Sequence, residues 1–238
     1  MQKRMKLGIG IACAIAVVVV ILLIKNFSPL LFMNPLETGY VADTNILSFK
    51  NGIGSLYFIE VDDEYILIDA GTDREEVEKL LIEYEIDPRQ IRYVFLTHSD
   101  SDHVASLGLY ENAEIYMSED EVALLDGTSR RQFIFRNALP SGVKLEDITL
   151  LLDSQEVQIG AHTIQAVKTP GHTLGSMTFI LDAKYMFTGD AFSLEKGEFK
   201  VHPFSMDAKE SLESIEKIRQ LYKEGMMIFT THYGMDAR

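Results

Sequence analysis

The chain has 238 residues but only one cysteine, Cys13, and this scarcity excludes several kinds of protein. A single cysteine cannot form a disulfide within the chain, so a disulfide-stapled fold is excluded. Because Cys13 lies in an N-terminal apolar run, the rest of the chain has no thiolate for a metal site and no cysteine nucleophile. Any metal bound there must be held by His, Asp or Glu side chains. Internal repeats are absent as well, which excludes a repeat architecture.

Basic residues are scarce, and the excess of acid is unevenly distributed. The net charge is −14, yet residues 1–36 contain four basic and no acidic side chains, so residues 37–238 carry −18. Repulsion from an acidic body opposes its encounter with nucleic acid or anionic lipid. We therefore expect no nucleic-acid partner. Apolar residues make up 47% of the chain, which is enough to form a core and argues against disorder.

Residues 7–24 form an uninterrupted run of 18 apolar residues and glycines. As a helix this run is about 27 Å long, close to the ~30 Å hydrocarbon core of a bilayer. It is longer than a usual signal-peptide core, and no Ala-x-Ala cleavage site follows it. Three basic residues precede the run and one follows it, so the positive-inside rule places the start of the chain in the cytoplasm.

The sequence therefore predicts a single-pass protein of the cell membrane. Residues 1–6 are the cytoplasmic tip, 7–24 a transmembrane signal anchor, 25–36 a linker and 37–238 one extracytoplasmic domain. A cleaved signal peptide and a buried helix are the alternatives for residues 7–24. The buried helix is disfavoured because bulky apolar residues cover every face of the stretch Val17–Ile24.

From residue 37 onward, short strands bounded by turns are interspersed with helices. Helical spacing of apolar residues predicts helices at Asp73–Tyr84 and Asp207–Tyr222, and a third is expected at Ser118–Leu125. The strands we expect are Asn45–Phe49, Leu56–Val61, Tyr65–Ile68, Arg92–Leu96, Glu114–Met117, His162–Val167, Met177–Leu181, Tyr185–Phe187 and Met227–Thr230. The fold class is therefore mixed α/β.

The densest group of potential metal ligands directly follows the strand expected at Arg92–Leu96. It consists of His98, Asp100, Asp102 and His103. In an extended stretch, positions 98, 100 and 102 project to one side, and position 103 turns inward at the next element. So many carboxylate and imidazole groups on one side are costly unless a cation binds them, so we expect a metal here.

Three further candidate ligands follow later strands. His172 lies in the loop Pro170–Ser176, Asp190 ends a strand, and His232 ends the last strand. A strand followed by a loop delivers each side chain to one edge of a sheet, where loops leave an open coordination position.

These four motifs, in this order, resemble the metallo-β-lactamase-fold superfamily of metallohydrolases over essentially all of residues 37–238. The resemblance implies a four-layer αβ/βα sandwich with the site at its upper edge. One metal would be bound by His98, Asp100 and His172, and the other by Asp102, His103 and His232. Asp190 would bridge the two metals, and Asp69, in the family's early Asp-x-Gly turn, would orient ligands.

The chemistry that this resemblance implies is hydrolysis by a metal-bound hydroxide of an ester, amide, lactone or phosphoester. Asp102 would orient the water or accept its proton, and His202 and Tyr233 would shape the substrate pocket. We expect two divalent metal ions, with zinc favoured and manganese or iron as alternatives. The expected substrate is a small molecule or a component of the cell envelope.

Asp100 departs from the family pattern, because most members have a histidine there. A third carboxylate makes the shell more anionic, weakens Lewis acidity and moves preference from zinc toward manganese or iron. Flavodiiron proteins, and the extracytoplasmic hydrolase domain of bacterial competence DNA-channel proteins, look similar at this position. A non-hydrolytic di-iron redox or degenerate binding member, and an extracytoplasmic metal-dependent nuclease, therefore remain as alternatives.

Several better-known branches of the family fit less well. Only six residues follow His232, which leaves no room for the C-terminal region that binds glutathione in glyoxalase II. Phe192 and Ser193 stand where lactonases have a catalytic tyrosine, and Asp190 excludes the lactamase class with a cysteine ligand.

Overall fold

The computed structural model describes residues 17, 18, 20, 28–131 and 137–237. The chain divides into two units, residues 1–33 and 34–238. The described part of the first unit includes the 3-10 helix η1 (Ser28–Phe32). Within the described ranges, no helix has the length and apolar character needed to cross a membrane. The anchor predicted at residues 7–24 lies almost entirely outside these ranges and stays a prediction.

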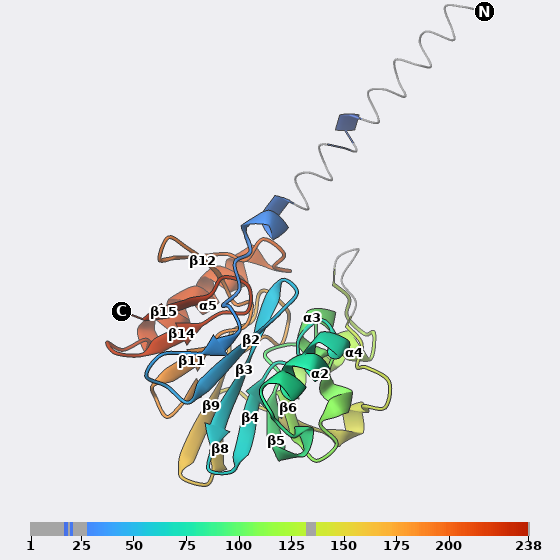
Figure 1. Ribbon diagram of the computed structural model, residues 1–238. Coiled ribbons are helices and arrows are strands. Elements are labelled where there is room, and N and C mark those ends of the chain that lie inside the picture. The colour runs from blue at the N-terminus through green and yellow to red at the C-terminus, as the bar shows by residue number, and fades with distance from the viewer. Residues whose placement is uncertain (1–16, 19, 21–27, 132–136, 238) are drawn as a thin grey trace, which may run out of the picture. The chain divides into compact units, whose positions relative to one another are not determined.

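The second unit is built on two β-sheets that pack face to face (Figure 1). The first sheet, in spatial order, contains β1 (Gly39–Tyr40), β2 (Ile46–Asn51), β3 (Gly54–Val61), β4 (Glu64–Ile68), β5 (Ile91–Phe95), β6 (Glu114–Ser118) and β7 (Ile148–Leu151). The second contains β15 (Met235–Ala237), β14 (Met227–Phe229), β11 (Tyr185–Phe187), β10 (Met177–Leu181), β9 (His162–Lys168) and β8 (Glu156–Ile159). A separate hairpin is formed by β12 (Ser193–Glu195) and β13 (Glu198–Lys200).

Four α-helices and further 3-10 turns connect these strands. They are α2 (Arg74–Glu83), α3 (Ser101–Val104), α4 (Val122–Leu125), α5 (Ala208–Leu221), η2 (Pro88–Gln90), η3 (Leu107–Leu109), η4 (Glu119–Glu121) and η5 (Leu145–Asp147). The two long helices begin where the sequence offers an N-cap. The Asp73 side chain accepts a hydrogen bond from the Glu76 amide, and Asp207 caps α5 in the same way.

Three apolar clusters hold these elements together in four layers. Between the sheets, Phe95 of β5 meets Phe179 of β10 with ring centroids 5.2 Å apart. The outer face of the first sheet packs against Val77 and Leu81 of α2, and the outer face of the second packs against Ile215 of α5. Helix, sheet, sheet and helix follow one another, as Figure 1 shows for α2 and α5 on opposite sides. The predicted αβ/βα sandwich is therefore confirmed for residues 34–238.

The elements that the sequence failed to predict lie mainly at the sheet edges. β1 and β7 border the first sheet, and β8 and β15 border the second. An edge strand has a neighbour on one side only, so its residues need not alternate strongly between apolar and polar. The helix expected at 118–125 is divided, because a 3-10 turn at Glu119–Glu121 precedes the short α4.

The inter-sheet core generates a stability prediction. Replacing the fully buried Phe179 with Ala should lower the free energy of unfolding by about 3–5 kcal/mol, because it opens a cavity between the two sheets. Ile82, with 78% of its surface exposed on α2, is the matched control, and Ile82→Ala should change stability by about 0.5 kcal/mol or less. Urea denaturation followed by circular dichroism measures both. Equal losses in the two variants would contradict the assignment of Phe179 to the core.

Candidate metal centre

The candidate ligands gather at one edge of the sandwich because of strand direction. β4 and β5 run parallel in the first sheet. In the second sheet β11 runs parallel to β14, and β9 has the same direction because both β9 and β11 are antiparallel to β10. Asp69 and His98 follow β4 and β5, and His172, Asp190 and His232 follow β9, β11 and β14. Carboxyl ends of parallel strands meet at the same edge, so distant segments of the sequence converge there.

Among the described residues, four groups of three side chains place one ligand atom of every member within 4.8 Å of the others, and two of these groups do not include Asp190. The first is His98, Asp100 and His172, and the second is Asp102, His103 and His232. In the first group, Asp100 Oδ2 lies 3.4 Å from both His98 Nε2 and His172 Nε2. In the second, Asp102 Oδ2 lies 3.4 Å from His232 Nε2 and 3.9 Å from His103 Nε2. These are the two sets that the family resemblance implied.

Asp102 reaches its group differently from the sequence expectation. We expected positions 98, 100 and 102 to alternate along an extended stretch, but Ser101–Val104 form the short helix α3. Asp102 and His103 are neighbours in that turn and join the second group, while Asp100 precedes the helix and joins the first. The start of α3 therefore divides the motif between two groups.

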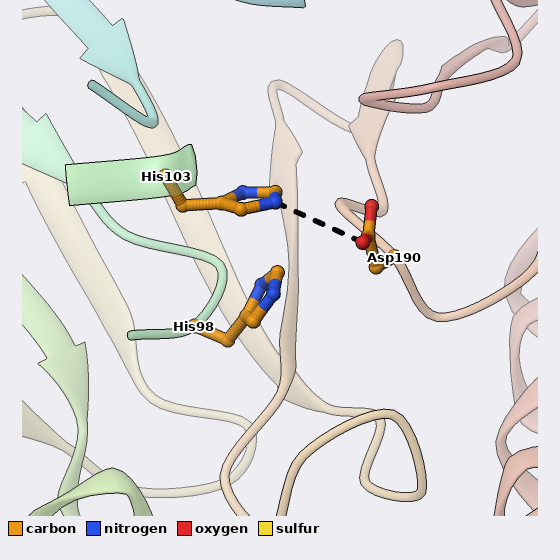
Figure 2. A group of neighbouring side chains, drawn as sticks. All are labelled: His98, His103 and Asp190. Atoms are coloured by element: carbon orange, nitrogen blue, oxygen red, sulfur yellow. Dashed lines mark ion pairs between the residues drawn. The ribbon is translucent and has the colours of Figure 1, made fainter. Parts of the chain in front are cut away.

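Asp190 lies between the two groups. Its Oδ2 is 3.4 Å from His172 Nε2 in the first group, and 3.1 Å from His232 Nε2 and 3.8 Å from His103 Nε2 in the second. Figure 2 shows His98 and His103 directed toward Asp190 from the opposite side of the site. Ligand atoms about 2.0–2.1 Å from a zinc ion at tetrahedral angles are about 3.3–3.4 Å apart. The separations around Asp190 are thus of the size that metal coordination requires.

Hydrogen bonds at Nδ1 orient several of the imidazole rings. His103 Nδ1 lies 2.8 Å from Asp69 Oδ2, and His232 Nδ1 lies 2.8 Å from the Ile53 carbonyl oxygen. Since a carboxylate and a carbonyl can only accept, each Nδ1 carries a proton, and each Nε2 offers a lone pair to the site once it has no proton of its own. The Nε2 atoms of His98 and His103 are buried and have no hydrogen-bond partner among the described residues. A bound cation would remove that desolvation cost.

His202 also joins the cluster, but its nitrogen nearest the site is a hydrogen-bond donor and not an acceptor. It is 2% exposed, and its Nε2 lies 3.7 Å from Asp190 Oδ2. The Phe204 amide donates to His202 Nδ1 over 3.4 Å, so neutral His202 carries its proton on Nε2. A protonated Nε2 donates rather than ligates. The geometry therefore fits the pocket residue that the sequence suggested better than a further metal ligand.

Tyr233 lies next to His202. The two ring centroids are 5.7 Å apart, and the Tyr233 hydroxyl is buried without a hydrogen-bond partner among the described residues. Burial raises the pKa of Tyr233, so its hydroxyl remains a donor. Tyr233 also lines a groove of about 590 Å³ along residues 34–42 and 233–235.

The electrostatics of the cluster keep the carboxylates ionised. Burial opposes ionisation of Asp190, but the surrounding histidines hold its pKa well below the usual range. Burial lowers the pKa of His172 to about 4. Burial also opposes a charge on His232, yet Asp190 and Asp102 raise its pKa to about 10. Carboxylates that stabilise a proton on His232 also attract a metal cation. The cation must displace that proton in order to bind His232.

Two supporting interactions hold the second group in place. Asp69 accepts hydrogen bonds from the Thr97 amide, over 2.8 Å, and from the Thr97 hydroxyl, besides its contact with His103. Gly189 precedes Asp190 with φ of +53°, and a Cβ there would come 2.4 Å from Thr97 Oγ1. Only glycine permits this close approach of the Asp190 loop to Thr97. Asp69 thus has the ligand-orienting contact that the resemblance implied.

Glu121 is a site residue that the sequence analysis missed. It is fully buried, and one carboxylate oxygen accepts from the Ser99 amide and hydroxyl. The other accepts from the Thr173 hydroxyl and the Gly175 amide. One side chain therefore joins the loop of His98 and Asp100 to the loop of His172. Nothing in the sequence around Glu121 signals this, because its partners are up to 54 positions away.

Arg131 and Asn137, also missed, hold the variant ligand Asp100. Arg131 is 7% exposed, and its Nη1 donates to Asp100 Oδ2 and lies 3.0 Å from His172 Nε2. Asn137 Nδ2 donates to Asp100 Oδ1 over 2.8 Å. Both oxygens of this carboxylate are thus oriented, and the guanidinium offsets its charge.

Comparison with known proteins places this site in a family. Residues 50–232 match the family model of the metallo-beta-lactamase superfamily. A probable metallo-hydrolase of Methanocaldococcus jannaschii is 30% identical over 174 residues, which cover 71% of each chain. A probable polyketide biosynthesis zinc-dependent hydrolase of Bacillus subtilis is 29% identical over 203 residues, covering 84% of this chain and 78% of that protein.

Solved structures agree on the fold. A subclass B3 metallo-β-lactamase of Bradyrhizobium japonicum superposes with a TM-score of 0.64 at 17% identity, covering 84% of this chain and 79% of that chain. The chain belongs to the metallo-β-lactamase superfamily, and within it to the metallo-hydrolases. The family predicted from the four motifs is therefore confirmed.

The contacts of Glu121 generate a second prediction. In Glu121→Gln an amide group replaces one oxygen and faces donors, so we expect a loss of about 2 kcal/mol or more in the free energy of unfolding. We also expect the protein to retain less metal, because the two ligand loops lose their common acceptor. The matched control is Glu119→Gln, since Glu119 lies two positions away and is exposed. Denaturation and elemental analysis measure both effects, and a Glu121 variant that behaves like the control would refute this role.

Proposed function

We propose that the chain is a membrane-anchored hydrolase with a dinuclear metal centre, acting outside the cytoplasm on an ester, amide, lactone or phosphoester. The observation that carries this proposal is the position of Asp190. A single oxygen of Asp190 lies within 3.4 Å of a histidine Nε2 from each of the two ligand groups. One carboxylate shared by two groups of buried ligands suits a pair of metal ions, which such a carboxylate can bridge.

Zinc is the metal that we propose for both positions. The donor set contains only imidazoles and carboxylates, which zinc accepts at tetrahedral sites. The anionic character of Asp100 argued for manganese or iron, but the guanidinium of Arg131 offsets that charge and weakens the argument. The Bacillus subtilis relative that is named as a zinc-dependent hydrolase supports the same choice.

The metal ions, when bound, would supply an activated water and a Lewis acid. The protein would hold and direct the reactants. Asp102 has 23% of its side chain exposed, whereas Asp100 and Asp190 are each 4% exposed. Asp102 is therefore the carboxylate that water entering the site reaches most readily, and it can accept a hydrogen bond that orients this water.

His202 would act on the substrate side of the centre. Its Nε2–H has no hydrogen-bond partner among the described residues and lies beside Asp190, so it can donate to a substrate oxygen on which charge develops. Tyr233 offers a second buried hydroxyl next to it. Donors held before substrate arrives need no reorganisation during the reaction.

The substrate that we propose is a small molecule or a component of the cell envelope. The charge of −18 on residues 37–238 repels polyanions, so nucleic acid is disfavoured. Residues 7–24 would keep the enzyme at the membrane, with the acidic domain on the outer side.

Asp190→Asn tests the catalytic proposal in the full chain purified in detergent. We expect two zinc ions per wild-type chain, and hydrolysis of at least one member of a panel of phosphodiester, β-lactam, lactone and thioester substrates. The variant should bind less zinc and turn over about 100-fold more slowly or worse, since the shared ligand loses its charge. Asp182→Asn, on the exposed pair with His162, is the control and should retain both properties.

Three outcomes would reject the proposal. Wild-type turnover in Asp190→Asn would exclude a bridging role for this carboxylate. Iron together with reduction of oxygen or nitric oxide would favour the redox alternative. One metal or none, with no turnover, would favour a degenerate binding protein.

The anchor is tested separately by fractionation of cells that produce the full chain. We expect the protein to remain in the membrane pellet after an alkaline wash, because residues 7–24 can span the hydrocarbon core. A variant lacking residues 7–24 should move to the soluble fraction. External protease should digest the domain of the full chain in spheroplasts. Recovery of the intact full chain in the soluble fraction would reject the anchor.

A further inference from the structure

Arg131 introduces a permanent positive charge into the first ligand group. Its side chain is 1% exposed and has an ion pair with Asp100. The same Nη1 atom lies 3.0 Å from His172 Nε2, and Nη2 donates to the Phe204 carbonyl oxygen over 2.6 Å. An arginine side chain stays protonated in proteins, so the guanidinium acts only as a donor.

The contact with His172 uses the electrons that a metal ion would need. An imidazole nitrogen has one lone pair in the ring plane, and a guanidinium N–H directed at His172 Nε2 occupies it. Asp100 Oδ2 has further lone pairs and could keep Arg131 while binding a metal, but His172 Nε2 could not. A metal ion bound by His98, Asp100 and His172 therefore requires Arg131 to leave His172.

Among the residues that the structure describes, the second ligand group has no such competitor. No Lys or Arg in the described ranges lies within ion-pair distance of Asp102, whose ion pairs in those ranges are with His103 and His232. A metal ion at the second group therefore meets no fixed cation among the described residues, whereas one at the first group must displace Arg131 from His172. The two positions thus differ in what a metal must displace.

We propose that Arg131 competes with the metal ion at the His98–Asp100–His172 position, so that the two positions fill with unequal affinities. The Asp102–His103–His232 position fills first. The second ion enters only when Arg131 gives up His172, and Arg131 then remains near Asp100. This inference rests on the proposed metal centre and specifies the order in which it loads.

Zinc titration of the metal-free full chain in detergent, by competition with a chromogenic chelator, tests the proposal. We expect the wild-type chain to bind two zinc ions in two resolved steps. In Arg131→Met, which keeps the length of the side chain but removes the charge and the donors, the weaker step should tighten about tenfold or more. The stronger step should be unchanged. Arg130→Met, at the exposed neighbouring position, is the matched control and should titrate like the wild type.

Each result bears on a definite part of the proposal. Two equal steps in the wild type, or a weaker step that stays the same or becomes weaker still in Arg131→Met, would overturn the role of Arg131 while leaving the metal centre intact. Absence of zinc binding in the wild-type chain would overturn the proposed function itself. Should Arg131→Met not fold, Arg131→Lys serves instead. Lysine keeps the charge and shortens the reach, so release of His172 should still tighten the weaker step, and no change would overturn the proposal.

Discussion

The structure of this site depends on one electrostatic constraint, which is the gathering of three carboxylates in one cluster, the buried Asp100 and Asp190 and the partly buried Asp102. Carboxylates this close repel one another, and burial removes the water that would screen them. The protein counters them with imidazoles, one guanidinium and oriented hydrogen bonds. A bound cation would complete that balance. The buried donors, the bonded Nδ1 atoms and the close approach of Gly189 to Thr97 all follow from holding these charges together.

The fold meets this constraint by dividing the ligands between two sheets. Asp69, His98 and the α3 residues come from the first sheet, and His172, Asp190, His202 and His232 come from the second or from loops that follow it. Each ligand group combines residues from both sheets, so the apolar interface of Phe95 and Phe179 also sets the distances within each group. The carboxylate of Asp190 lies where contributions from the two sheets meet. The packing between the two sheets therefore determines both the stability of the sandwich and the geometry of the centre.

The sequence predicted those features that are encoded locally. Ligands next to strand ends, such as His98 and Asp190, were found because a buried strand followed by His or Asp has a recognisable pattern. Glu121, Arg131 and Asn137 were not found. Each acts through partners more than twenty positions away, and no spacing rule connects them. The role of Asp100 was interpreted without its counter-charge, the guanidinium of Arg131, on which the metal preference of this position also depends. The edge strands were missed because each has a neighbouring strand on one side only. Their residues therefore need not alternate strongly between apolar and polar.

The bonding of Glu121 has a consequence for how this site can change during evolution. Ser99, Thr173 and Gly175 provide donors that only a carboxylate at position 121 satisfies in full. Loss of Glu121 alone would leave buried donors without an acceptor, and loss of the two hydroxyl groups alone would leave a buried charge undersolvated. Substitutions at these positions should therefore occur together across related proteins. A branch that lacks Glu121 is expected to have replaced Ser99 and Thr173 as well, and to join its two ligand loops by apolar packing.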